Sequence, residues 1–528
     1  MSSAPSGLGR SLLTLKPSSP NRWTSGPAIV AYIAIALFAA HMLTASRYGL
    51  LMDELYFLAC SEHLAWGFID HPPLIALIAY IARHLFGESM LGLHILPSLA
   101  AAGLVWVVGC ITRELGGGRF AQATSALAVA LTPAYLLFLC SLTIMAFEPL
   151  VWAGCAYLFI KALRNGRFKD WILFGVLVGF GLELKYTLAI FAFSLFAGLL
   201  LSPSRWELRN WRPWAASGIA LLILSPNLLW EYVHDFPFYK WQQHIRTLPG
   251  SERFDYSLAT FFSKQAMFML PAILLVLAGL WYFLASPIGK RFRYFGFAAL
   301  IVTAICSRTG KPHYSLAIYS VLIAGGAILL EHRTDPTNLR WLRSVYTLVA
   351  VALGLVLAPC FLPVLPIERY VDYEHSLHLP LPIRMEDYEV QSEIPENFAW
   401  EFGWKEMVAG VAQTYNLLSD EEKKKVGILG GSYGEAGSVD LLGKKYGLPK
   451  AACTQLSYHD FGPTNLNQEV IIFIGPSPED LARLCDSVQP GAYLANPYGY
   501  DGQRGPIINV CRGLHFDLVK HWREIQTY

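Results

Sequence analysis

Long apolar segments separated by short polar loops fill the chain from residue 27 to residue 364. A helix needs about 20 predominantly apolar residues to cross a bilayer, and eleven segments approach this length, although 171–184 and 187–201 are short. The pattern predicts a polytopic α-helical membrane protein with about 11 transmembrane helices. The predicted spans are 27–45, 89–111, 121–140, 148–163, 171–184, 187–201, 214–232, 265–285, 294–307, 314–331 and 344–364.

The charged residues divide the chain into two parts. Residues 1–364 contain 27 Lys and Arg against 16 Asp and Glu, whereas residues 365–528 contain 14 against 23. In the first part the basic clusters fall in every second loop, as they do in the cytoplasmic loops of membrane proteins. We therefore expect residues 1–26 to form a cytoplasmic segment, residues 27–364 a transmembrane domain, and the tail to lie outside. Basic cytoplasmic loops explain the positive charge, so no nucleic-acid partner is expected.

The tail has the pattern of a small soluble domain. Residues 365–400 are rich in Pro and acidic residues and are expected to form a linker, and residues 401–528 an extracytoplasmic α/β domain. Strands are predicted for KKKVGILG and EVIIFIG, and helices for EAGSVDLLGKKYG and PEDLARLC. The segment GGSYGEAG lacks the GxGxxG spacing of a nucleotide site, so we interpret it as a tight turn from strand to helix. The tail has three cysteines, Cys453, Cys485 and Cys511, which allow at most one disulfide.

A polar stretch from Met52 to Leu74 interrupts the apolar pattern after the first span. Ionisable groups beside membrane spans are costly and usually functional. Asp53 and Glu54 either form a hydrated turn or lie near the headgroups, where a carboxylate could act as general base on an acceptor hydroxyl. The run after them, LYFLACSEHLAWGF, is amphipathic enough to lie in the membrane interface.

The segment Asp70-His71-Pro72-Pro73 precedes an apolar helix, LIALIAYIARHLF. The two prolines exclude Asp70 and His71 from that helix and hold them at a fixed break. One carboxylate and one imidazole make half a metal site at best. These side chains either cap the helix or contact a phosphate or a sugar.

Two ionisable residues interrupt later spans. Glu148 stands before Pro149 at the outer end of a span, where it either occupies a first helical turn or faces an aqueous cavity. Lys185, in GLELKYT, either pairs with an acid or binds an anionic ligand at bilayer depth.

The loop from Ser307 to Tyr314 is basic although it belongs to the outer set of loops. It contains Arg308, Lys311, His313 and Tyr314. A cationic cluster at headgroup level suggests a bound phosphate, to which Arg can donate two parallel hydrogen bonds and Lys can offer a single compact positive charge. The alternative is an ordinary basic loop.

These motifs together resemble the polyprenyl-phosphate-sugar-dependent glycosyltransferases of the GT-C type, which include protein O-mannosyltransferases and bacterial aminoarabinose transferases that act on lipid A. The matching motifs lie between Ala28 and Glu331: Asp53-Glu54, Asp70-His71-Pro72-Pro73-Leu74, Glu148-Pro149, GLELKYT, PNLLWEYVHDFP and Gly310-Lys311-Pro312-His313-Tyr314.

The resemblance implies that Asp53 is the catalytic base and that Glu148, where the family usually has Asp, supports it. Glu54, Asp70 and His71 are expected to contact the acceptor or a metal. Aminoarabinose transferases carry Glu-Lys where this chain has Asp70-His71, so the contact made there is expected to differ. No cofactor is certain, and a divalent metal ion stays open. The donor would be a polyprenyl-phosphate-linked sugar and the acceptor a glycolipid, a cell-envelope glycan or a protein. The enzyme would lie in the inner (plasma) membrane, with its site facing the periplasm or exterior.

The expected reaction is a direct displacement with inversion. The acceptor hydroxyl attacks the anomeric carbon and Asp53 takes its proton, while Lys185, Arg308 and Lys311 stabilise the departing lipid phosphate. His313 and Tyr314 belong to the same phosphate site.

The alternative function is a transporter or lipid flippase with an outer binding domain, in which Glu183, Lys185 and Glu231 line the path. Internal repeats would favour it, and we find none. An inactive scaffold with an outer binding domain is a third possibility, which Asp53 and the cationic loop disfavour.

Overall fold

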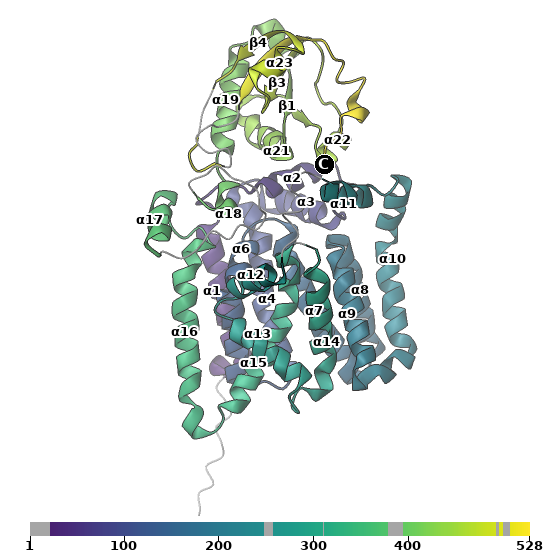
Figure 1. Cartoon of the computed structure of the whole chain (residues 1–528), viewed down its shortest axis with the longest axis vertical. Helices are drawn as coiled ribbons and strands as arrows, with labels where there is room; N and C mark the ends of the chain where they lie inside the picture. Colours follow the sequence, from purple (N-terminus) through teal and green to yellow (C-terminus); the bar gives the residue numbers. More distant parts are fainter. Residues whose placement is uncertain (1–21, 248–256, 310, 378–393, 493–495, 500–506) are drawn as a thin grey trace, which may run out of the picture.

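A bundle of upright helices carries a smaller α/β domain on one end (Figure 1). The structure is a computed structural model that describes residues 22–247, 257–309, 311–377, 394–492, 496–499 and 507–528. Most of the predicted N-terminal segment, much of the predicted linker and Gly310 of the cationic loop lie outside the described residues.

Every predicted span contains a helix, although only some of these helices are long. Six are long and apolar enough to cross a membrane alone, namely α1, α4, α7, α10, α15 and α16, and two bent helix pairs could raise the number to eight in the described part of the chain. The count of eleven crossings stays a prediction. The bundle comprises α1 (Gly26–Thr44), α4 (Met90–Glu114), α5 (Arg119–Leu131), α6 (Pro133–Phe138), α7 (Ile144–Asn165), α8 (Phe168–Leu184), α9 (Thr187–Leu201), α10 (Trp211–Val233), α12 (Leu258–Phe268), α13 (Ile273–Leu284), α14 (Arg293–Cys306), α15 (Leu316–Arg333) and α16 (Trp341–Leu357).

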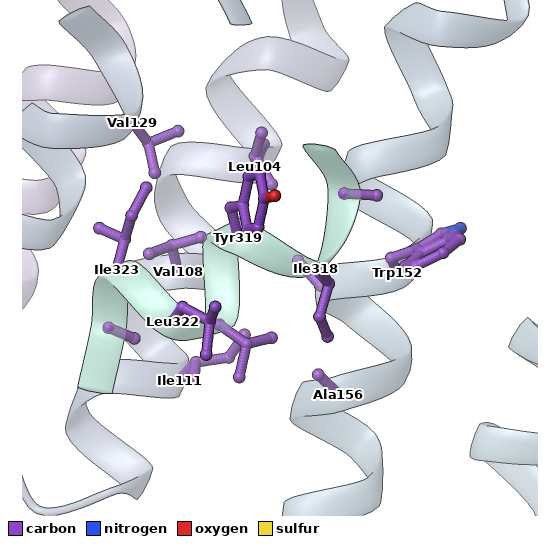
Figure 2. Close-up of a cluster of buried hydrophobic side chains, with 14 of the residues drawn as sticks. Leu104, Val108, Ile111, Val129, Trp152, Ala156, Ile318, Tyr319, Leu322 and Ile323 are labelled. Atoms are coloured by element: carbon purple, nitrogen blue, oxygen red, sulfur yellow. The ribbon is translucent and has the colours of Figure 1, made fainter. Parts of the chain in front are cut away.

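Helix α15 forms the centre of the bundle. Figure 2 shows its side chains meeting those of α4, α5 and α7. Close approach to α13 depends on glycine, since a Cβ at Gly279 would lie 1.8 Å from the carbonyl oxygen of Leu322 and one at Gly326 would lie 2.0 Å from that of Leu275. Small residues permit such backbone contact between membrane helices.

The loop that joins α15 to α16 and the start of α10 lie at the end of the bundle opposite the α/β domain (Figure 1). Arg164, after α7, pairs with Glu114 at the end of α4. Arg212, at the start of α10, donates to the carbonyl oxygen of Gly166 at 2.6 Å. The chain therefore separates its predicted cytoplasmic loops from its tail, as the charge pattern predicted.

The α/β domain is built on a five-stranded sheet of order β2-β1-β3-β5-β4. β1 pairs in parallel with β2 and β3, whereas β5 pairs antiparallel with β3 and β4. The two predicted strands are β1 and β3, and the helix predicted after β1 is α21, so these predictions are confirmed; PEDLARLC forms only the single turn α23. One disulfide, Cys485–Cys511, joins β4 to β5. The elements are β1 (Gly427–Gly430), β2 (Ala451–Cys453), β3 (Val470–Ile474), β4 (Cys485–Pro490), β5 (Ile508–Leu514), α19 (Trp404–Asn416), α20 (Asp420–Lys423), α21 (Tyr433–Leu442), α22 (Leu456–Asp460) and α23 (Pro478–Leu481).

The described parts of the predicted linker are helical. They comprise α17 (Ile367–Leu377) and α18 (Glu396–Ala399). Phe398 packs edge-on against the ring of Tyr48, which follows α1, and Tyr370 packs edge-on against Phe398. The hydroxyl of Tyr48 donates to the carbonyl oxygen of Leu365 at 3.0 Å. The linker is therefore anchored on the membrane domain at both of its described ends.

Two short helices lie between the bundle and the α/β domain: α2 (Met52–Cys60) and α3 (Leu74–Phe86) (Figure 1). α3 begins directly after Pro73, as the two prolines predicted. Residues 54–60 of α2 are all buried, because α2 is covered by the α/β domain. The helical part of the predicted interfacial run is thus covered by protein, whereas Leu64 and Trp66 after it are exposed. That the run lies in the membrane interface stays a prediction. One continuous hydrophobic cluster joins the two domains, from Leu55 and Leu142 to Val408 and Ile472.

Candidate functional site

Asp53 stands in the first turn of α2, half-buried at the junction of the two domains. Its Oδ1 accepts a hydrogen bond of 3.0 Å from the hydroxyl of Tyr433, the first residue of α21. A carboxylate in the first turn of a helix is stabilised by the partial positive charge there. The position therefore suits an ionised acid, which is what a general base requires.

Glu54, the next residue, points into the protein and has a different role. Its carboxylate accepts bonds from His94 Nε2 at 2.9 Å, from the amide of Leu142 at 2.5 Å and from the amide of Leu51 at 2.8 Å. Three donors satisfy most of what a carboxylate can accept. We therefore correct the prediction that Glu54 contacts an acceptor or a metal: it joins α2 to α4 and to the turn before α7.

Asp70 and His71 are also held by protein partners. The hydroxyl of Tyr56, in α2, donates to Asp70 Oδ1 at 2.5 Å. Burial and the Asp70 carboxylate raise the pKa of Tyr56 well above its ordinary value, so this hydroxyl keeps its proton. His71 is buried, stacks on Phe68 and donates from Nδ1 to the carbonyl oxygen of Pro72 at 2.8 Å.

A metal ion does not fit this arrangement. No group of three or more His, Cys, Asp or Glu side chains in the described part of the chain is arranged to hold one. The imidazole Nε2 of His71 lies 4.0 Å from Asp70 Oδ1. The imidazole ring is surrounded by the aromatic rings of Tyr56, Phe57 and Phe68. His71 therefore has a structural role among the described residues, whereas Asp70, whose side chain is 15% exposed, keeps its predicted acceptor contact as a prediction.

A second cluster surrounds Glu148 at the same end of the bundle. Helix α7 begins at Ile144, so Glu148 lies in its second turn and not in the first. Its carboxylate is buried, with Oε2 3.0 Å from Lys185 Nζ, and Oε1 accepts a bond from the hydroxyl of Thr187. The acid that sequence analysis left without a partner is therefore paired with the lysine that it also singled out.

Lys185 occupies the break between α8 and α9. Besides Glu148, its ammonium contacts Met145 Sδ at 3.2 Å and lies over the ring of Tyr314, 4.3 Å from the centroid. The side chain keeps 17% of its surface exposed, so a ligand anion can reach it. The predicted salt bridge is confirmed, and a phosphate contact stays compatible with it.

Tyr314 brings the cationic loop to this cluster. Its ring also lies 5.9 Å from Lys311 Nζ and packs edge-on against His313. Arg308 is exposed, and no ion pair or hydrogen bond of its guanidinium is found among the described residues. Four of the predicted phosphate ligands, Lys185, Lys311, His313 and Tyr314, therefore lie together, and Arg308 precedes them in the loop.

Several partners of these residues could not be predicted from the sequence. His94 and Tyr433 gave no signal, because one lies in an apolar helix and the other in a distant domain. Between α9 and α10, Tyr186 donates to Asn227 Oδ1 at 2.7 Å and lies 3.4 Å from Glu231 Oε1. The motifs GLELKYT and PNLLWEY contain these residues, but their spacing did not reveal the contact.

The acids considered for a transport path lie at the outer ends of their helices. Glu183 is the last residue but one of α8, and Glu231 is two residues from the end of α10. A transporter site is expected near the midplane of the bilayer. The distribution of ionisable groups therefore disfavours the transporter alternative.

Comparison with known proteins identifies the type of fold. Residues 70–230 match the family described as dolichyl-phosphate-mannose-protein mannosyltransferase. The lipopolysaccharide core galacturonosyltransferase RgtB of Rhizobium johnstonii is 26% identical over 213 residues, which are 37% of this chain and 41% of RgtB. The chain thus matches less than half the length of this curated relative.

Solved structures resemble the chain over most of its length. ArnT from Cupriavidus metallidurans, bound to undecaprenyl phosphate, superposes with a TM-score of 0.60 at 13% identity and covers 91% of this chain and 97% of ArnT. The oligosaccharyltransferase AglB from Archaeoglobus fulgidus, in complex with an inhibitory peptide and a dolichol-phosphate, has a TM-score of 0.50 at 14% identity over 86% of this chain and 69% of AglB. The chain therefore has the GT-C glycosyltransferase fold, and the resemblance to polyprenyl-phosphate-dependent transferases that its motifs predicted is confirmed.

Proposed function

We propose that this membrane protein transfers a sugar from a polyprenyl-phosphate donor to a hydroxyl group of an extracytoplasmic acceptor, with inversion at the anomeric carbon. The observation that carries the proposal is the position of Asp53. It is a half-buried carboxylate in the first turn of α2, at the end of a GT-C bundle that also holds the basic cluster of Lys185 and Lys311. A base and an anion site on one side of the membrane are what this reaction needs.

Asp53 would act as general base. The acceptor hydroxyl attacks the anomeric carbon, its proton passes to the Asp53 carboxylate, and the bond from that carbon to the phosphate oxygen breaks with both electrons leaving on the oxygen. A positioned base contributes about 10²–10⁴ in rate. Because the leaving group is a lipid phosphate, no nucleotide is required outside the cell.

Lys185, Lys311 and Arg308 would hold the phosphate of the donor. Negative charge grows on the phosphate oxygen as the bond breaks, and fixed cations stabilise that charge most where water is excluded. The carboxylate of Glu148 keeps Lys185 at one place by a 3.0 Å ion pair. Glu148 would thus support catalysis through the donor site, and the support of Asp53 that the resemblance implied stays a prediction.

The site and the α/β domain would face the periplasm or the exterior of an inner (plasma) membrane. The basic loops lie at the opposite end of the bundle, and such loops are cytoplasmic in most membrane proteins. A disulfide in the α/β domain is typical of an oxidising compartment. The acceptor class, whether glycolipid, glycan or protein, is left to experiment.

The test uses purified protein in detergent with undecaprenyl phosphate carrying radiolabelled mannose or galacturonic acid, the sugars named for the matched family and for RgtB. Extracted cell-envelope lipids, glycan and protein serve as acceptors. We expect one donor to lose its sugar only when an acceptor fraction is present. Movement of intact donor across a vesicle membrane without any sugar transfer would contradict the proposal and favour a flippase.

A further inference from the structure

Helix α21 of the α/β domain packs directly on α2, the helix that carries Asp53. Two glycines of α21 make this contact possible. A Cβ at Gly434 would lie 2.6 Å from the side chain of Met52, and one at Gly437 would lie 3.0 Å from the Cβ and the carbonyl oxygen of Leu55. The segment GGSYGEAG therefore serves a close contact between the two domains, in addition to turning the chain from β1 into α21.

The first turn of α21 is fixed by a dense set of hydrogen bonds. Ser432 caps the helix by accepting from the amide of Glu435, whose carboxylate accepts from the amides of Gly431 and Ser432 at 2.7 and 3.1 Å. The amide of Tyr433 donates to Gln455 Oε1 at 3.1 Å. The backbone of Tyr433 is thus held directly by Gln455, and the cap formed by Ser432 and Glu435 fixes the turn around it.

The side chain of Tyr433 then crosses the domain boundary. Its hydroxyl donates to Asp53 Oδ1 at 3.0 Å, and its ring lies 4.9 Å from the ring of Tyr56. The same boundary holds a second link, because the amide of Ser457 donates to the Tyr56 hydroxyl at 3.3 Å and its Oγ accepts from the amide of Ile69 at 3.0 Å. The α/β domain therefore bonds both to the helix of Asp53 and to the segment that leads to Asp70.

The domain is docked over a wide area and is not merely tethered. Lys450 pairs with Glu62, and Lys444 Nζ lies 3.1 Å from Glu88 Oε1. Beneath these ion pairs the hydrophobic cluster runs from α2 into α19 and the sheet. A contact between Tyr433 and Asp53 is consequently a defined part of the folded protein.

We propose that Tyr433 is a positioning residue for the reaction, so that the α/β domain completes the transferase site. The inference rests on the proposed function, in which Asp53 is the base. A phenol hydroxyl keeps its proton at neutral pH, and where it donates to a carboxylate oxygen it stabilises the ionised form of that carboxylate. By donating to Asp53, Tyr433 orients the carboxylate toward the acceptor and favours the form that takes up a proton.

The experiment uses the full-length protein and compares Tyr433→Phe, Asp53→Ala and the double variant. Tyr433→Phe keeps the aromatic ring against Tyr56 and removes only the hydroxyl. Tyr458→Phe is the matched control, since it removes a tyrosine–aspartate bond of 3.1 Å to Asp440 within the same domain. Three quantities are measured: the melting temperature in detergent, the affinity for undecaprenyl phosphate, and the rate and pH profile of transfer from the mannose or galacturonic acid donor.

We expect Tyr433→Phe to lower the transfer rate at saturating donor about ten- to a hundredfold. This factor corresponds to the free energy that a hydrogen bond to a charged group contributes. The acidic limb of the pH–rate profile should move to higher pH, while affinity for undecaprenyl phosphate and the rate of Tyr458→Phe stay unchanged. The double variant should be no slower than Asp53→Ala, and its loss of melting temperature should be smaller than the sum of the two single losses.

Three results would overturn the inference. If the losses of melting temperature in the two single variants simply add, Tyr433 and Asp53 are not in contact, and this result needs no sugar donor. If Asp53→Ala is inactive while Tyr433→Phe keeps the rate and the pH profile of the wild type, the positioning role is wrong although the base assignment stands. If Asp53→Ala itself transfers sugar normally, the proposed function of Asp53 fails first, and the inference fails with it.

Discussion

Replacing Glu148 by Gln should make the donor phosphate bind more tightly while it destabilises the protein without lipid. The substitution keeps the size of the side chain and removes its charge. Lys185, whose ammonium lies 3.0 Å from the Glu148 carboxylate and is only 17% exposed, then has no anionic partner at that position. Removing one member of a buried pair costs about 3–5 kcal/mol, and the lower end applies here because Lys185 is partly exposed.

A bound phosphate would replace the missing charge. A charge-assisted bond from Lys185 Nζ to a phosphate oxygen is about 2.8 Å long. The same Nζ lies 3.0 Å from Glu148 Oε2. The phosphate and the Glu148 carboxylate would thus lie at most about 6 Å apart. Two like charges at that distance repel by roughly 3 kcal/mol at an effective dielectric constant of 20, and by about 1.4 kcal/mol if solvent at the site doubles that constant. Glu148→Gln should therefore tighten binding about ten- to a hundredfold.

The assay is a titration of purified protein with undecaprenyl phosphate, together with thermal melting with and without the lipid. We expect Glu148→Gln to melt at a lower temperature than the wild type alone and to recover most of the difference when the lipid is saturating. Glu114→Gln is the matched control, because Glu114 pairs with Arg164 at the opposite end of the bundle. Unchanged or weaker lipid binding by Glu148→Gln would refute the phosphate contact of Lys185.

Three further predictions concern the loop, the topology and the docking of the α/β domain. Arg308→Gln should weaken binding of undecaprenyl phosphate about ten- to a hundredfold, since a charge-assisted bond contributes roughly 1.5–3 kcal/mol, and should leave acceptor affinity unchanged in a parallel titration. In intact cells an impermeant thiol reagent should label Glu421→Cys, which is exposed in the α/β domain, and not Lys290→Cys at the basic end of the bundle; the reverse pattern would invert the topology. Burial opposes ionisation of Glu62, but bonds from Lys450 and Arg83 outweigh it and lower its pKa to about 2. Because this pKa is depressed, its stabilising effect is present above about pH 4.5 and lost as the pH falls toward 2, so melting measured from pH 5 to pH 2 should be less pH-dependent in Glu62→Gln.

Sequence patterns predicted those parts of the molecule that depend on neighbours in the chain. The two prolines after His71 fix the start of α3, because proline excludes the residue before it from a helix. The apolar runs around Ile428 and Ile472 form strands since both are short and buried on each face. The position of Lys185 predicted an acidic partner or an anionic ligand, because unpaired charges are costly at membrane depth.

Contacts between distant segments could not be read from the pattern. Asp53 and Glu54 look equivalent in sequence, yet successive side chains on a helix point about 100° apart, so one faces the junction and the other faces His94. Tyr433 lies 380 residues from Asp53, and no local signal links them. The metal or acceptor contact expected for His71 failed because burial among aromatic rings is a property of the folded chain.

The proposed reaction depends on Asp53 as the base of a lipid-phosphate-dependent transferase. The most direct measurement is the single-turnover rate of sugar transfer by Asp53→Asn, with the undecaprenyl-phosphate donor that the wild type uses. Asp235→Asn, which changes an exposed acid after α10, is the control. We expect Asp53→Asn to transfer sugar more slowly by a factor of about 10²–10⁴ and to bind undecaprenyl phosphate with the affinity of the wild type. Transfer at a near-normal rate by Asp53→Asn would contradict this expectation.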